Sequence, residues 1–290
     1  MSAWGADDPV DWASRKLGDC GVESPRLEAQ LLLALALGIS RSAVTAGLYG
    51  PIDDSRRAQF QGLVEARCHR TPLAYLRGSQ EFYGLDFEVG PAVLIPRPET
   101  EMLVDFGLDC LRANAASISR EPCLADVGIG SGCIAISVLA NYSQATGVGF
   151  EISSPAIDVA RTNAFRHGVA ARLTMMRSDL MTGVAASRFD LILSNPPYIA
   201  RGELESLQPE VRDAEPRLAL DGGVDGLDPY RRFAPQAMRS LVPGGFLAVE
   251  VGQGQAREVA ELFHRAGLRG VEIRKDLASI ERLVAARRPR

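Results

Sequence analysis

The sequence predicts an α/β protein: a small bundle of helices followed by a mostly parallel sheet with helices on both faces. Residues 1 to about 76 show helical patterns only. From about residue 99 onward, short apolar runs alternate with segments of helical periodicity. This alternation is typical of a parallel sheet that is covered by helices on both sides.

The composition is that of an ordinary globular protein. Of its 290 residues, 46% are hydrophobic and 23% are charged, which is enough to bury a core. The net charge of −4 argues against the global basic field that nonspecific nucleic-acid binders use. No apolar run approaches the roughly 20 residues of a membrane span, and residues 1–8 lack the basic start of a signal peptide. The five cysteines show no metal-binding spacing, so we expect a cytoplasmic protein with free thiols and no metal.

Capping signals divide the N-terminal region into four or five short helices. Ser24-Pro25 places an N-cap residue before a proline at the first helical position, and Gly38 ends that helix. The other predicted segments are Val10–Leu17 with Gly18 past its end, a short helix after Ser40 or Ser42, and one from Asp53-Asp54-Ser55 to Thr71-Pro72. This bundle either only packs or recognises a partner, and the sequence leaves both open.

Residues 77 to 98 differ in character from the bundle before them. Three glycines punctuate short apolar stretches here, a pattern that predicts a hairpin. Residues 93–101 then form a bridge between the bundle and the next domain. In this bridge, Pro98 can begin a helix with Glu99 and Glu101 in its acidic first turn. The bridge is either a stiff linker or part of the lining of a site. We expect three segments: helices at 1–76, a hairpin and linker at 77–98, and the sheet domain at 99–290.

Seven strands are predicted in the sheet domain. They are 123–127, 147–151, 173–176, 189–193, 246–251, 271–274 and 283–286. The helices between them are 133–141, 154–167, 229–241 and 256–266. The last two strands are expected to form a hairpin that adds an antiparallel edge strand. The long segment 199–227 is either a loop that folds over a substrate or an ordered surface excursion.

A glycine-rich turn follows the first of these strands. Gly128-Ile129-Gly130-Ser131-Gly132 lets a ligand approach the backbone closely, because glycine has no side chain. Glu151 ends the second strand, where its carboxylate can accept both hydroxyls of a ribose. Asp179-Leu180 follows the third strand, where it can border an adenine. Together these features predict an adenosine-containing cofactor, and the GxGxG spacing disfavours NAD, whose folds carry GxGxxG.

The stretch Ser194-Asn195-Pro196-Pro197-Tyr198 follows the fourth predicted strand. Neither a strand nor a helix continues through its two prolines. The Pro196 carbonyl and the Asn195 side-chain oxygen can then face one point as two fixed acceptors. Such a pair suits an NH2 group, which has two hydrogens to donate. Taken alone, the stretch is equally compatible with a rigid turn that has no chemical role.

The chain resembles class I S-adenosylmethionine-dependent methyltransferases, and among these the bacterial protein-glutamine N5 methyltransferases that modify peptide chain release factors. The likeness covers nearly the whole chain. It rests on the stretches Pro72–Tyr75, Glu81–Tyr83, Leu94–Glu101, Ser194–Ile199, Glu215–Gly222 and Lys275–Leu277. Asn-Pro-Pro-Tyr marks amino-nitrogen methylation in general, including adenine N6 enzymes, whereas the bridge at 94–101 and the helical N-terminal domain narrow the likeness.

The resemblance implies a Rossmann-like seven-stranded sheet and a glutamine amide as methyl acceptor. Asn195 and the Pro196 carbonyl would accept the two N–H bonds of that amide, and no catalytic base is required because the nitrogen becomes acidic once methylated. The implied S-adenosylmethionine site comprises Gly128, Ile129, Gly130, Ser131, Gly132, Glu151, Asp179, Leu180 and Asn195. The implied substrate site comprises Asn195, Pro196, Pro197, Tyr198 and Phe82. The substrate would be the Gly-Gly-Gln loop of release factors, held partly by the helical domain of a monomeric enzyme.

Two residues depart from the pattern of this family. Ile129 stands where a small hydroxyl residue is usual, and Glu151 stands where aspartate is usual. We expect the backbone turn to survive and the cofactor to bind with altered affinity. Three other interpretations stay open: glutamine methylation of a ribosomal protein, adenine N6 methylation of nucleic acid, and a binding module without catalysis. The net charge and the lack of a recognisable base-reading domain disfavour the nucleic-acid interpretation.

Overall fold

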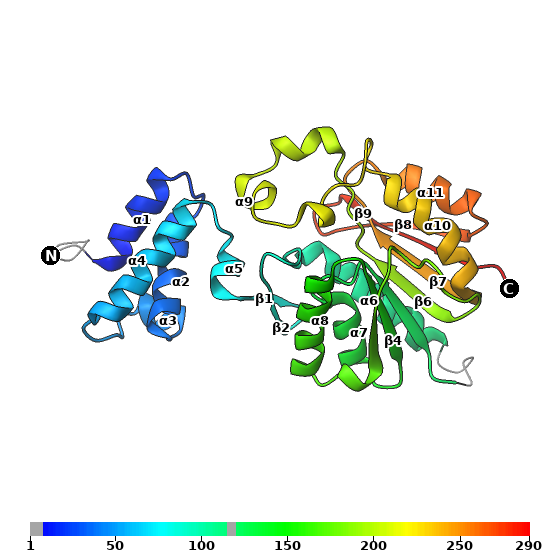
Figure 1. Ribbon diagram of the computed structural model, residues 1–290, viewed down its shortest axis with the longest axis horizontal. Coiled ribbons are helices and arrows are strands. Elements are labelled where there is room, and N and C mark those ends of the chain that lie inside the picture. The colour runs from blue at the N-terminus through cyan, green and yellow to red at the C-terminus, as the bar shows by residue number, and fades with distance from the viewer. Residues whose placement is uncertain (1–7, 115–119) are drawn as a thin grey trace. The chain divides into compact units, whose positions relative to one another are not determined.

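A computed structural model describes residues 8–114 and 120–290 of the chain (Figure 1). Its contacts divide into two compact units. One unit comprises the residues up to Gly78 together with Gln208–Ala214, and the other comprises Ser79–Leu207 and Glu215–Arg290. The expectation that the first eight residues are no signal peptide concerns 1–7, which lie outside the described residues.

Five helices form most of the first unit. They are α1 (Pro9–Asp19), α2 (Pro25–Leu37), α3 (Arg41–Thr45), α4 (Asp54–Cys68) and α5 (Leu73–Arg77). Side-chain oxygens of Asp8, Ser40 and Asp53 accept backbone N–H bonds at the starts of α1, α3 and α4, so three helix ends are capped. The expected end of the first helix at Gly18 is wrong, because α1 runs through that glycine to a cap at Cys20.

A sixth short helix, α9 (Pro209–Arg212), joins this unit from a distant part of the sequence. Its Glu210 lies 2.9 Å from an Arg67 guanidinium nitrogen and 3.2 Å from one of Arg70. Arg67 is also 2.5 Å from Glu28 of α2, and its side chain is only 7% exposed. Such a buried cation requires both carboxylates, since an unpaired charge is costly to bury.

The second unit is built on a seven-stranded sheet in the order β5-β4-β3-β6-β7-β9-β8. Its strands are β3 (Cys123–Val127), β4 (Thr146–Glu151), β5 (Leu173–Arg177), β6 (Phe189–Ser194), β7 (Leu241–Glu250), β8 (Arg269–Lys275) and β9 (Glu281–Arg287). The predicted α/β fold class is thereby confirmed. The expected closing hairpin is confirmed, because β8 and β9 pair antiparallel. The strand that runs against the parallel ones is β9, which lies inside the sheet between β7 and β8, so only its expected place at the edge is wrong.

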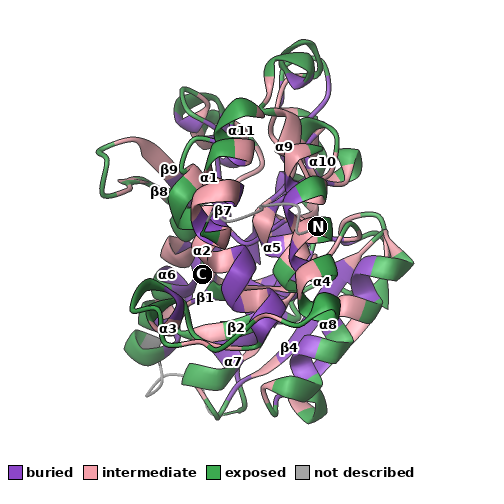
Figure 2. Cartoon of the chain, turned by 90° about the vertical axis from the view of Figure 1, so that its left-hand side faces the viewer, coloured by how far each residue is buried: buried purple, intermediate pink, exposed green. Residues whose placement is uncertain are grey.

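Helices cover both faces of this sheet. One hydrophobic core lies under α6 (Glu101–Asn114), α7 (Cys133–Asn141) and α8 (Ser154–Arg166), and a second lies under α10 (Asp228–Ser240) and α11 (Ala256–Arg265). Figure 2 shows α8 buried along one side and exposed along the other, as expected for a helix that packs on a sheet. Ser153 caps α8, since its side-chain oxygen accepts the N–H of Ala156.

A two-stranded hairpin precedes the sheet. Its strands β1 (Ser79–Phe82) and β2 (Leu85–Glu88) are joined by Tyr83-Gly84, both with positive φ, the backbone that a two-residue hairpin turn favours. The buried amide of Asn163 in α8 accepts the N–H of Glu88 and donates to the carbonyls of Glu88 and Ser131. The hairpin is therefore tied to the glycine-rich turn that contains Ser131.

The strand order reverses between β3 and β6. From β3 the chain continues outward through β4 and β5, and then returns to place β6 on the other side of β3. In open α/β sheets, ligands bind in the crevice at the carboxyl ends of the strands at such a switch point. In residues 8–114 and 120–290, no helix is both long and apolar enough to cross a lipid bilayer.

Arg67 offers a test of the contacts that hold the first unit. We expect Arg67→Ala to lower the free energy of unfolding of this unit by about 3 kcal/mol, because it leaves the largely buried Glu28 without its cation and leaves Glu210 with Arg70 alone. The measurement is urea unfolding followed by tryptophan fluorescence, since both tryptophans precede residue 13. Arg56→Ala on the same helix is the control: its pair with Asp53 is exposed, so the cost should stay below about 0.5 kcal/mol. Equal effects of the two substitutions would contradict the prediction.

Candidate functional site

The glycine-rich turn lies at the carboxyl end of β3 and begins α7. Gly128, Gly130 and Gly132 all have positive φ, which L side chains rarely adopt. A Cβ at Gly132 would approach the Ile136 Cδ1 atom to 2.6 Å, whereas a Cβ at Gly128 would meet nothing within 4 Å. The turn is therefore tight toward the helix and open toward the crevice, as a cofactor seat requires.

Asp126, the next-to-last residue of β3, is fully buried beside this turn. Its Oδ2 accepts the backbone N–H of Ala135, whereas its Oδ1 has no partner among the described residues. Burial raises the pKa of this carboxyl to about 7. An unpartnered acceptor in a buried place fits a ligand that brings a hydrogen-bond donor, such as the amino group of an amino acid.

Glu151 ends β4 next to the turn. Its Oε2 accepts the N–H of Gly130 at 3.1 Å, and its Oε1 accepts the N–H groups of Ile152 and Ser153. A carboxylate offers about four acceptor positions, so one on Oε2 is left for a ligand hydroxyl. The structure thus gives Glu151 a second task that the sequence did not indicate: it holds the turn in place.

Ile129 faces the protein core instead of the crevice. Its side chain is 3% exposed, and its Cδ1 would lie 2.2 Å from a Cβ placed on Gly149 of β4. Its N–H and that of Gly128 both donate to the Phe150 carbonyl. The missing hydroxyl at this position is therefore replaced by core packing that Gly149 makes possible, and the backbone of the turn is retained.

Asp179 and Leu180 follow β5 at the same edge of the sheet. The Asp179 carboxylate forms an ion pair with Arg232 of α10. Leu180 has a positive φ of 53° and packs against the core under α10 and α11. The place of these two residues at the strand end agrees with the expected border of an adenine, and their contact with it stays a prediction.

Asn195 stands directly after β6 and next to the end of β3. Ser194 Oγ donates to the Val127 carbonyl at 2.6 Å and so ties the two strand ends together. The Asn195 Nδ2 atom donates to Thr100 Oγ1 at 3.1 Å. Pro196 is buried, and among the described residues no hydrogen bond to its carbonyl is found. The side-chain oxygen of Asn195 and the Pro196 carbonyl are therefore both left as acceptors.

A buried carboxylate lies behind Asn195. Thr100 Oγ1 donates to Glu250 Oε2 at 2.6 Å, and the two residues are 2% and 3% exposed. The Tyr198 hydroxyl approaches Glu250 Oε1 to only 3.5 Å, which is long for such a bond. Burial raises the pKa of Glu250 to about 7 and that of Tyr198 to about 12. A connected chain, Asn195–Thr100–Glu250, thus runs from the site into the core.

Sequence reasoning missed Thr100, Glu250 and Asp126 as members of the site. Two signals were available: Thr100 lies in the bridge that narrows the resemblance, and Glu250 is an acid at the end of a strand otherwise rich in apolar residues. Phe82, expected to wall the substrate pocket, is 1% exposed and packs edge to face against Phe87. Its contact with substrate stays a prediction.

The segment 199–227 is an ordered excursion whose base is fixed beside Tyr198. Ile199 forms a parallel bridge with Asp221, and the Tyr198 carbonyl accepts the Gln255 side-chain amide. Farther along, the buried carboxylate of Glu215 pairs with Arg97 at 2.5 Å. The backbone that follows the Asn195 motif is thus held within the second unit at Ile199 and again at Glu215.

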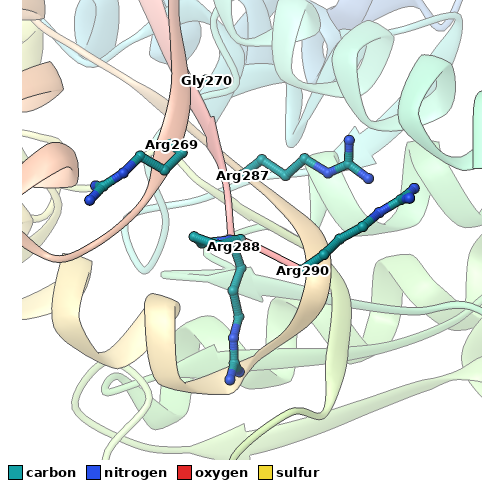
Figure 3. Close-up of a pocket in the computed structure, with 6 residues that line it drawn as sticks. Arg269, Gly270, Arg287, Arg288 and Arg290 are labelled. Carbon is teal, nitrogen blue, oxygen red and sulfur yellow. The ribbon is translucent and has the colours of Figure 1, made fainter.

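A pocket at the opposite edge of the sheet is lined by arginines. It has a volume of about 190 Å³ and is bordered by Arg269, Gly270, Arg287, Arg288, Pro289 and Arg290. The guanidinium groups point in different directions (Figure 3), and Arg287 and Arg288 donate to the backbone carbonyls of Gly244 and Leu241. These side chains close strand ends and do not converge on a ligand.

The chain is similar to known proteins over nearly its whole length. Residues 9–78 match the family model of the PrmC N-terminal domain, and residues 101–225 match that of the methyltransferase small domain. A release factor glutamine methyltransferase of Geobacter sulfurreducens is 45% identical over 284 residues, which cover 98% of this chain and 97% of that protein. Another, of Caulobacter vibrioides, is 39% identical and covers 98% and 94%.

Two solved structures share the fold at low sequence identity. A methyltransferase from Pyrococcus furiosus has a TM-score of 0.51 at 17% identity, covering 79% of this chain and 98% of that one. The hMettl16 catalytic domain in complex with MAT2A 3′UTR hairpin 6 has a TM-score of 0.57 at 14% identity, covering 77% and 81%. These similarities concern the fold alone.

Glu151 provides a test of the cofactor site. We expect Glu151→Ala to weaken S-adenosylmethionine binding by about 10- to 100-fold, because it removes a charged acceptor for the ligand and for the turn at Gly130. Titration calorimetry gives the Kd directly. Glu151→Asp, which keeps the charge, is the control and should stay within about threefold of the original chain. An unchanged Kd for the alanine variant would remove Glu151 from the site.

Proposed function

Because this chain belongs to the family of release factor glutamine methyltransferases, it is an S-adenosylmethionine-dependent glutamine methyltransferase, and we propose that Asn195 and Pro196 hold the amide that it methylates. The observation that carries this proposal is the orientation of Asn195. Its Nδ2 atom is occupied by Thr100, so its oxygen is left for the substrate.

The residues at the strand ends fit the cofactor. The open backbone at Gly128, the acceptor position on Glu151 and the unpartnered oxygen of Asp126 suit its methionine part and its ribose, with Asp179-Leu180 at the adenine. The bound cofactor supplies a methyl group on a sulfonium, which is a strong electrophile. The task of the protein is then to align the acceptor nitrogen for in-line attack and to keep water away.

An amide nitrogen is a poor nucleophile, because its lone pair is delocalised into the carbonyl. Two acceptors, Asn195 Oδ1 and the Pro196 carbonyl, would bind its two N–H groups, orient the nitrogen and stabilise the positive charge that develops on it. Preorganised acceptors cost little reorganisation at the moment of reaction, and the rigid Pro196-Pro197 backbone supplies that preorganisation. Tyr198 would pack on the amide plane, and its backbone is held by the bond that its carbonyl accepts from the Gln255 side-chain amide.

The substrate we propose is the glutamine of the Gly-Gly-Gln motif in peptide chain release factors. The names of the relatives and the match of residues 9–78 to the PrmC N-terminal domain support it. We infer that the helical unit helps hold the release factor, and that the enzyme acts as a monomer in the cytoplasm, where translation ends. A ribosomal-protein glutamine and an adenine amino group are the alternative acceptors.

Asn195→Ala tests the role of the amide acceptor. We expect the variant to bind S-adenosylmethionine with a Kd within about twofold of the original chain and to lose at least about 100-fold in kcat, since an acceptor that stabilises transition-state charge is removed. Calorimetry and a methyl-transfer assay measure the two quantities. Asn141→Ala, which deletes the same amide at the end of α7, is the control and should retain activity. Transfer preserved in Asn195→Ala at saturating cofactor would refute the proposed role.

The substrate class is tested with labelled cofactor and four acceptors. These are a release factor, its variant with alanine in place of the loop glutamine, a ribosomal protein and DNA. We expect label on the unaltered release factor alone. Label on the ribosomal protein would keep the chemistry and change the substrate, and label on DNA would show that the helical unit was misinterpreted.

A further inference from the structure

The hydrogen-bond chain behind Asn195 has a definite direction. An ionised Glu250 can only accept, so the short 2.6 Å bond to Thr100 uses the single hydroxyl hydrogen of Thr100. Thr100 Oγ1 then has no hydrogen left and can only accept from Asn195. The amide group of Asn195 must therefore present Nδ2 to Thr100, which is the observed arrangement at 3.1 Å.

We propose that Thr100 and Glu250 are positioning residues that fix the side-chain amide of Asn195 with its oxygen toward the substrate. The inference rests on the proposed function, because it assumes that Asn195 binds the amide to be methylated. An amide that turned over would offer its own NH2 to the substrate NH2, and two donors cannot bind each other. One buried carboxylate thus selects the productive orientation without touching the substrate.

The hydrogen bonds from Asn195 to Thr100 to Glu250 also strengthen the acceptor that they orient, which is Asn195 Oδ1. A hydrogen bond donated by an amide NH2 increases the delocalisation of the amide, so the oxygen at its other end becomes more negative. Successive bonds from Asn195 to Thr100 to Glu250 polarise one another, and they do so in a buried place where the effect is little screened by water. Asn195 Oδ1 therefore binds the N–H groups of a nitrogen that is becoming positive more strongly than an isolated asparagine would.

The donor-to-acceptor direction of these hydrogen bonds depends on the charge of Glu250. Its pKa is raised to about 7, chiefly by burial, while its bond with Thr100 and the charge of Arg282 oppose the rise. Once protonated, Glu250 can donate to Thr100, and Thr100 is then free to donate to Asn195 in the wrong orientation. Transfer should therefore decrease as the pH falls through about 7.

Few other groups near Glu250 change charge in this range. The titratable and charged groups that face it are Glu99 before α6, Cys133 of α7, Tyr198 after β6, Tyr230 of α10 and Arg282 of β9. Burial raises the pKa of Cys133 and Tyr198 to about 12 and that of Tyr230 still further, so these three stay neutral. Asp126 beside the glycine-rich turn also has a pKa raised to about 7, so the experiment must separate its titration from that of Glu250.

The test compares kcat–pH profiles of Thr100→Val, Thr100→Ser and Glu250→Gln between pH 5.5 and about 8.5 at saturating substrates. Thr100→Val keeps the shape and removes the hydroxyl, so we expect kcat to fall by about 10- to 100-fold with the cofactor Kd unchanged. Thr100→Ser restores the hydroxyl and should recover kcat to within about threefold. Glu250→Gln removes the titrating group, so the part of the acid decrease that Glu250 causes should disappear while that of Asp126 remains.

Asn195→Ala separates the proposed function of Asn195 from the positioning role of Thr100 and Glu250. If it retains transfer, the proposed function of Asn195 fails; if it loses transfer while Thr100→Val keeps the original kcat, only the positioning role fails. An unchanged acid decrease in Glu250→Gln would equally overturn the role of Glu250. Should Thr100→Val fail to fold and therefore not bind the cofactor, the profile of Glu250→Gln decides.

Discussion

The pairing of β3 with β6 is the interaction on which the site depends. Leu124 pairs with Leu191 and Asp126 with Leu193, and the Ser194 hydroxyl closes the ladder on the Val127 carbonyl. Parallel strands end at the same edge of a sheet, so this register places the turn at 128–132 beside the motif at 195–198. The two segments proposed to bind cofactor and acceptor amide are thus brought together by backbone geometry, before any side chain contributes.

Two buried carboxylates distinguish this site from the surrounding core. Asp126 and Glu250 are 0% and 3% exposed, and burial raises the pKa of both to about 7. Such groups reduce stability unless they are fully bonded, and one oxygen of Asp126 has no partner in residues 8–114 and 120–290. They lie near the ends of β3 and β7, on either side of β6, one beside the glycine-rich turn and one behind Asn195, and such positions are typical of residues kept for function at the expense of stability.

The excursion after the motif links local rigidity to the architecture of the chain. It is held within the sheet domain by the bridge between Ile199 and Asp221 and by the pair of Arg97 with Glu215. Its middle, Gln208–Ala214, belongs to the helical unit, where Glu210 meets Arg67. The helical unit is therefore completed by a segment that leaves the sheet domain only ten residues after Tyr198, and its stability depends on that segment.

The sequence by itself determined the elements and the chemistry at the strand ends. The periodicity of apolar residues and the helix-capping residues are local signals. They sufficed to predict the seven strands, the α/β class and the turns that carry Gly128–Gly132 and Asn195. Only the tertiary structure decided that β9 lies inside the sheet, that Ile129 packs into Gly149, and that Thr100 and Glu250 stand behind Asn195. Those contacts join residues up to 150 positions apart. Local patterns contain no information about such pairs, because it is the order of strands in the sheet that sets which distant side chains meet.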